Sequence, residues 1–66
     1  AESKPDFIHK LAIALKEAKE SEYWIELLTQ SDYLEKKGAD SLISDLTQLI
    51  KLLTAIIKKS RLSLRS

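Results

Sequence analysis

The chain has 66 residues, no cysteine and a formal net charge of +1, which indicates one small domain without disulfides or thiolate metal sites. A chain this short buries a low fraction of its surface, so two helices on their own seldom form a stable fold. No apolar run approaches the roughly 18 residues of a membrane span, and the first residues do not read as a signal peptide. We therefore expect a cytoplasmic protein with no membrane partner.

The first predicted helix runs from about residue 4 to about residue 30. Ser3 is placed to cap it, Pro5 suits its first turn, and Asp6 stands three residues after the cap, as in a capping box. Positions four and three residues apart form an apolar stripe with a small-residue middle, which lets a facing helix come close. The stripe consists of Phe7, Leu11, Ala14, Ala18, Ser21, Ile25 and Leu28.

Further apolar side chains widen this stripe on both sides. Ile13 and Trp24 extend one side, and Ile8 and Leu15 extend the other. A helix that packs on a single neighbour does not need so wide a surface, so we expect contact with more than one helix. Large aromatic side chains dominate buried contacts, which makes Trp24 an interface candidate. The alternative is that Trp24 covers one end of the chain's own core.

Residues 31–34 form a short link to a second predicted helix over about 35–59. Gly38 weakens its first turn, which leaves Asp40 as an alternative cap. This helix carries the strongest apolar pattern in the chain, with a polar opposite side. Its main stripe is Leu42, Leu46, Leu49, Leu53 and Ile56, flanked by Ile43, Ile50 and Ile57. Residues 60–66 are expected to form a frayed tail.

These elements predict an all-α fold, an antiparallel two-helix hairpin. Two wide apolar faces exceed what two helices can cover for each other, so the hairpin is expected to associate into a four-helix bundle or a larger helical oligomer. A homodimer is the simplest assembly, because a symmetric copy supplies the other two helices. The expected interface residues are Phe7, Leu11, Ile13, Trp24, Leu28, Leu46, Leu49 and Leu53.

No constellation of residues points to catalysis or to a cofactor. His9 is the sole histidine, and no second metal ligand or nucleophile accompanies it. Glu22 and Glu26 lie one turn apart, but the Glu-x-x-His motif of di-iron bundles is missing. Glu20 projects toward the Trp24 side, where it is either partly buried and paired or solvated, as glutamates usually are. We expect neither an enzyme nor a cofactor.

The charge is unevenly placed along the chain. Residues 1–33 carry four bases against seven acids, and residues 34–66 carry seven bases against three acids. One explanation is a pair of complementary helices whose basic C-terminal end is favoured by the helix dipole. The other is a weak, non-specific RNA-binding end, far from the aromatic residues that could stack bases. Its residues would be Lys51, Lys58, Lys59, Arg61 and Arg65.

Residues 7–28 carry a distinctive arrangement of Glu20, the pair Tyr23-Trp24 and the pair Leu27-Leu28. With Tyr33-Leu34 and residues 46–58, this segment resembles the bacterial four-helix-bundle family named for proteins encoded in intervening sequences of 23S ribosomal RNA. The family's first two helices, with their Ser-Ile-Pro-Ala-Asn-Ile-Ala-Glu-Gly signature, have no counterpart, so the chain resembles the second half of that fold. Two interpretations stay open: a fragment of a longer four-helix protein, or a hairpin whose second copy replaces the first half.

What the resemblance implies is a binding module rather than an enzyme. Members of the family have no known enzymatic activity and a poorly defined role. Related accessory proteins of diversity-generating retroelements form ring-like oligomers that bind a reverse transcriptase and nucleic acid. Two hypotheses about function follow: an oligomeric scaffold that binds protein, and a nucleic-acid-binding module that uses the basic end.

Overall fold

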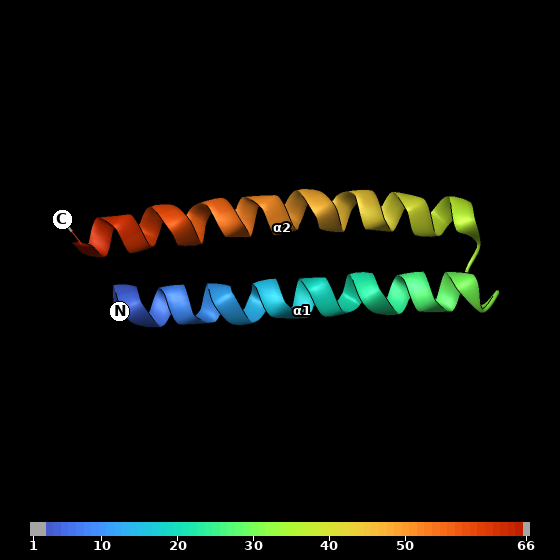
Figure 1. Ribbon diagram of the computed structural model, residues 1–66, viewed down its shortest axis with the longest axis horizontal. Coiled ribbons are helices and arrows are strands. Elements are labelled where there is room, and N and C mark those ends of the chain that lie inside the picture. The colour runs from blue at the N-terminus through green and yellow to red at the C-terminus, as the bar shows by residue number, and fades with distance from the viewer. Residues whose placement is uncertain (1–2, 66) are drawn as a thin grey trace.

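Two long helices lie side by side in opposite directions in the computed structural model, which describes residues 3–65 and the side chains of residues 3–64 (Figure 1). Helix α1 spans Lys4–Gln30 and helix α2 spans Lys36–Arg65. The molecule measures 48 × 17 × 15 Å, and both described chain ends lie at the same end of the rod. Neither helix is long and apolar enough to cross a membrane. The predicted antiparallel hairpin is confirmed.

Helix α1 begins as its first residues predict. The Ser3 hydroxyl accepts a hydrogen bond from the backbone N–H of Asp6 at 3.4 Å, and Pro5 lies in the first turn. The Ser3 carbonyl accepts the first helical bond from the N–H of Phe7 at 3.0 Å. The cap satisfies backbone donors that a helix N-terminus otherwise leaves unpaired.

Helix α1 ends in a Schellman motif that reverses the chain. Asp32 has a φ of 64°, in the left-handed region. The N–H of Tyr33 donates to the carbonyl of Leu28 at 2.8 Å, and the N–H of Asp32 donates to the carbonyl of Thr29 at 3.1 Å. These are the two bonds that define the motif, with an aspartate at the position that glycine usually occupies. The link is therefore short and held by the backbone.

Helix α2 begins one residue later than predicted. The carbonyl of Glu35 accepts a hydrogen bond from the N–H of Ala39 at 3.0 Å, which makes Glu35 the capping residue. Gly38 is helical, so the turn that contains it is formed and Asp40 does not act as a cap. Asp40 instead pairs with Lys36 one turn earlier at 3.6 Å.

The prediction of a frayed tail from residue 60 is wrong as far as residue 65, because α2 continues to Arg65. Residue 66 lies outside the described chain. Ser60 is half-buried between the helices, and the Lys4 ammonium donates to the Ser63 hydroxyl at 2.7 Å. Contact with the start of α1 thus holds the last turn of α2, and basic residues suit a helix C-terminus.

The two helices meet along a narrow strip that we call the seam. Its members are buried or half-buried and recur every three or four residues on each helix, as packed helices require. Among the described residues, the buried members are Ile8, Ala18, Ala39, Leu53 and Ile57, and no large side chain is fully buried. The half-buried members are Leu11, Leu15, Glu22, Ile25 and Thr29 on α1 and Ile43, Leu46, Ile50 and Ser60 on α2.

The seam lies to one side of the apolar stripes that the sequence predicted. On α1, Ile8 and Leu15 occupy the contact, whereas Phe7 is 46% exposed and Ala14 is also exposed. On α2, the expected flanking residues Ile43, Ile50 and Ile57 lie in the seam, and Leu42 and Leu49 are exposed. Both stripes are wider than one neighbour can cover, and the hairpin contact uses only one edge of each.

Candidate interaction surfaces

One long side of the hairpin is apolar. Around each helix, every residue is turned by about 100° from the one before it. Phe7, Ala14 and Ser21 are each one residue before a seam residue of α1, and Leu42 and Leu49 are each one residue before a seam residue of α2, so all of them lie on the preceding side of their seam. Both helices are right-handed and they run in opposite directions, so positions that precede the seam in each helix lie on the same side of the hairpin. We call this side the apolar face. Its members are Phe7, Ala14, Ser21 and Leu28 of α1 and Leu42, Leu49 and Ile56 of α2.

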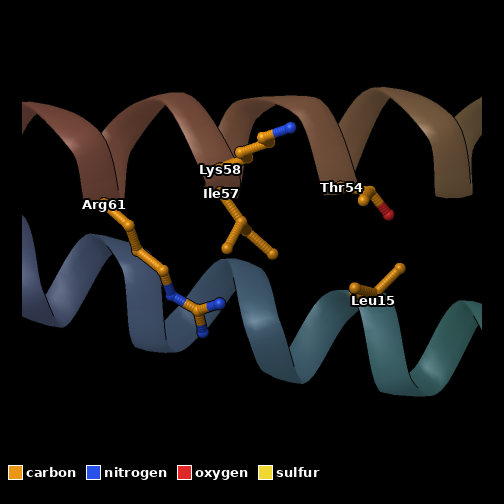
Figure 2. A pocket seen from close by; sticks show the side chains of 5 residues that line it. All are labelled: Leu15, Thr54, Ile57, Lys58 and Arg61. Atoms are coloured by element: carbon orange, nitrogen blue, oxygen red, sulfur yellow. The ribbon is translucent and has the colours of Figure 1, made fainter.

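The opposite side, the polar face, carries residues that follow the seam. There the Thr47 hydroxyl of α2 donates to the Glu22 carboxylate of α1 at 3.4 Å. Farther toward the chain ends, Leu15, Thr54, Ile57, Lys58 and Arg61 line a shallow groove (Figure 2). Arg61 reaches from α2 across to α1, and Lys58 points away from α1.

The groove has an apolar floor and cationic walls. The Thr54 hydroxyl donates to the carbonyl of Ile50 in its own helix at 2.7 Å, which leaves the Lys58 ammonium and the Arg61 guanidinium as the charged groups lining the groove. Ammonium and guanidinium groups are hydrogen-bond donors without acceptor atoms, so they suit anions. Neither of these two groups is a nucleophile paired with a base.

The expected interface residues separate into three groups in the structure. Phe7, Leu28 and Leu49 are exposed on the apolar face. Leu11, Leu46 and Leu53 lie in the seam, where Leu11 and Leu46 are half-buried and Leu53 is buried. Ile13 and Trp24 project from the outer side of α1, away from α2.

Trp24 does not cover the core of the hairpin. Its side chain is 50% exposed, and its ring packs edge-on against Tyr23 with centroids 5.4 Å apart. Glu17, Glu20, Ser21 and Trp24 surround a second shallow hollow on the outer side of α1. Glu20 is exposed there, so the expectation that it is solvated holds. The half-buried glutamate is Glu22 in the seam, which the sequence pattern did not single out.

The basic residues of α2 do not form a single patch. Lys58 and Arg61 share the groove, and Lys51 lies two turns earlier on the same face. Lys59 points outward from α2, and the side chain of Arg65 lies outside those described. The fold adds Lys4 to this end through its bond to Ser63, a neighbour that only the antiparallel pairing reveals.

An aromatic side chain lies closer to the basic end than the sequence order suggests. The antiparallel pairing brings Phe7 level with the last turns of α2. Phe7 nevertheless belongs to the apolar face, whereas Lys58 and Arg61 line the opposite face. The basic groove therefore gains no base-stacking platform from it.

The remaining titratable residues of α1 are dispersed. His9 and Glu26 are exposed, and Glu22 is engaged with Thr47. In the described part of the chain, no three His, Asp or Glu side chains are grouped closely enough to hold a metal ion.

Comparison with known proteins yields one family. No curated protein and no solved structure matches the chain. The sequence model of the family described as 23S rRNA-intervening sequence protein matches residues 1–55. Lys51 lies within the matched segment, and Lys58, Lys59, Arg61 and Arg65 follow it. The match is the one that the resemblance of residues 7–58 predicted, and the chain belongs to the 23S rRNA-intervening sequence protein family.

Proposed function

We propose that the chain is a non-enzymatic scaffold module whose apolar face packs against a second copy of the hairpin to complete a four-helix bundle. The observation that carries this proposal is the direction of the apolar stripes. On each helix the stripe is centred between the seam and the apolar face. That is the direction in which a bundle helix points its core residues, because it has one neighbour on each side.

The interior of the hairpin is too thin for a stable monomer. Two of the five buried residues in the described part of the chain are alanines, and Leu42 and Leu49 are left in water. Burying a leucine contributes about 2 kcal/mol, so covering the apolar face is strongly favoured. The 48 × 17 Å face has a projected area of about 800 Å², which is of the order of the surface that a standard stable interface buries per partner.

A pair of adjacent leucines gives a matched test. Leu28 on the apolar face is 38% exposed, and its neighbour Leu27, which points away, is 37% exposed. Both belong to the last turn of α1 and have the same helix propensity. Leu28→Gln should weaken self-association at least tenfold, and Leu27→Gln should leave it within a factor of two or so.

Sedimentation velocity over a concentration series measures this effect. Wild type should change from a species of twice the 7.5 kDa chain mass to monomer on dilution, with loss of helical circular dichroism. A folded monomer at every concentration would refute the proposal. Equal effects of the two glutamines would show that a different surface mediates assembly.

A second candidate function, binding of RNA through the basic end, is favoured by one observation. Lys58 and Arg61 line one groove, and Lys4 lies at the same end of the rod. Lysine and arginine neutralise phosphates without reading bases, so such binding would be non-specific and sensitive to salt. The helix dipole explains the same residues without a ligand, and we rank RNA binding below the scaffold function.

A further inference from the structure

The hairpin is an electrical dipole along its length. We divide the described chain at its middle, between the loop half (residues 17–54) and the open half (residues 3–16 and 55–64). The loop half holds eight acids against four bases, a net charge of −4. The open half holds six bases against one acid, a net charge of +5. The division follows the antiparallel pairing, in which Glu22 lies beside Thr47 and Lys4 beside Ser63.

From this dipole we infer that the second copy packs antiparallel, with its loop beside the open end of the first. The inference rests on the proposed self-association and specifies its partner geometry. A twofold axis across the middle of the rod places each acidic half against a basic half. A parallel arrangement places +5 beside +5 and −4 beside −4, and like charges in register are costly.

The apolar face of α1 has the symmetry that this axis requires. Read along the helix, its residues are large, small, small and large: Phe7, Ala14, Ser21 and Leu28. Their midpoint lies between residues 17 and 18. A twofold axis there sets Phe7 against Leu28 of the second copy and Ala14 against Ser21. The small pairs let the two α1 helices approach closely at the centre, and the large pairs fill both ends.

The same axis places specific residues of α2 together. The Glu22–Thr47 and Lys4–Ser63 contacts set the midpoint between residues 17 and 18 level with the midpoint between residues 50 and 51. Leu49 then faces Leu52 of the second copy, across the axis. Asp45 lies about three residues, or roughly 4.5 Å of helix rise, from the level of Lys59 of the second copy. Helical side chains lean toward the N-terminus, which brings the Lys59 ammonium toward the Asp45 carboxylate.

The orientation of the two copies is measured between spin labels on the loop. The chain has no cysteine, so Ser31→Cys gives one attachment site per chain. Antiparallel copies hold the two labels apart by most of the 48 Å length of the rod. Parallel copies hold them within roughly 20 Å, because bundle helices lie about 10 Å apart. Lys51→Cys, near the middle of the rod, reports association without depending on the orientation.

The contact between Asp45 and Lys59 is tested by exchanging the charges. Asp45→Lys and Lys59→Asp should each weaken self-association about tenfold, because symmetry doubles the effect of a rim charge pair. The double variant should regain wild-type affinity, and an equal mixture of the two single variants should associate as a heterodimer. Asp40→Lys makes the same change of charge on the polar face and should have little effect.

The outcomes separate this inference from the proposed function. A long distance between the loop labels together with rescue by the double variant supports antiparallel packing. Two results would overturn antiparallel packing and leave the scaffold function standing. One is self-association with a short distance between the loop labels, and the other is a double variant that does not regain the affinity lost in the single variants. A chain that stays monomeric with either label overturns both.

Discussion

Thr47 of α2 donates its hydroxyl hydrogen to the Glu22 carboxylate of α1 at 3.4 Å, and both side chains are half-buried. This bond links the two helices near the middle of the polar face. It places a charged group inside a seam that is otherwise mostly apolar. Because an unpaired carboxylate is costly where water is partly excluded, the bond favours the observed register of the helices.

Removing the donor should therefore destabilise the protein. We expect Thr47→Val to lower the free energy of unfolding by about 0.5–1 kcal/mol, because the Glu22 carboxylate loses its hydrogen-bond donor. The double variant Glu22→Leu with Thr47→Val should recover that loss, since it replaces both polar groups by apolar ones. Urea denaturation at one fixed protein concentration measures both, because the proposed self-association would add to the stability.

Thr54→Val is the matched control for that experiment. Its hydroxyl donates to the carbonyl of Ile50 within its own helix, so its removal leaves no charge unpaired. A loss as large for Thr54→Val as for Thr47→Val would mean that the threonines act through helix propensity and not through Glu22.

Asp32 occupies the left-handed position that ends α1, with a φ of 64°. Glycine adopts this conformation without a steric cost, so Asp32→Gly should raise the free energy of unfolding by about 0.5 kcal/mol. Asp32→Ala should lower the free energy of unfolding by about 1 kcal/mol. Alanine lacks the backbone freedom of glycine and the polar side chain with which aspartate tolerates the left-handed region. Thermal melts at matched concentration compare the three chains, and a stabilising alanine would contradict the assigned turn.

Gly38 lies in the first turn of α2 in an ordinary helical conformation, and an added methyl group would meet no atom within 4 Å. Gly38→Ala should therefore stabilise the protein by about 0.5–1 kcal/mol, through a smaller entropy loss on folding. Ala39→Gly at the neighbouring buried position should do the reverse. If Gly38→Ala destabilised the fold, the first turn of α2 would not be helical in solution.

Which features the sequence could predict depends on how local their causes are. The Ser3 cap is a contact within four residues, and α1 begins and ends where the pattern predicts. The frayed tail was a wrong prediction because its stabilising partner, Lys4, lies 59 residues away from Ser63. For the same reason, the sequence alone does not show that Lys4 lies beside the basic residues of α2.

The contact edge of each helix could not be predicted for a different reason. Periodicity gives the average direction of the apolar side chains and not the position of any one neighbour. Phe7 and Ile8 are both apolar, and only the position of α2 decides that Ile8 is buried and Phe7 exposed. The average direction of a wide apolar stripe therefore does not tell which of its edges contacts the other helix.

The outer aromatic pair of α1 gives a test of assembly by substitution. Trp24 lines a hollow together with Ser21 of the apolar face, whereas Tyr23 leans toward the polar face. Trp24→Ala should therefore weaken self-association about tenfold, and Tyr23→Ala should weaken it less. Trp24 is the sole tryptophan, so its emission also reports assembly in wild type and should shift to longer wavelength on dilution. A larger effect of Tyr23→Ala would move the interface to the polar face.

The antiparallel arrangement also predicts how weakly the basic end binds RNA. Each end that carries Lys58 and Arg61 would lie beside the acidic loop half of the second copy, which lowers its attraction for phosphate. We expect no binding of a labelled RNA stem at physiological salt, and weak binding at most near 50 mM salt, about micromolar or poorer. The affinity of any such binding should depend less steeply on salt concentration when Lys58, Lys59 and Arg61 are changed to glutamine.

The matched control keeps the charge change and moves it to the loop half. Changing Lys19, Lys36 and Lys37 to glutamine removes three bases from the loop half and should leave any RNA binding unchanged. Tight binding at physiological salt that depends on Lys58, Lys59 and Arg61 would instead favour the nucleic-acid function. It would also argue against antiparallel copies, because a parallel pair gathers both basic ends into one field strong enough to hold a phosphate backbone.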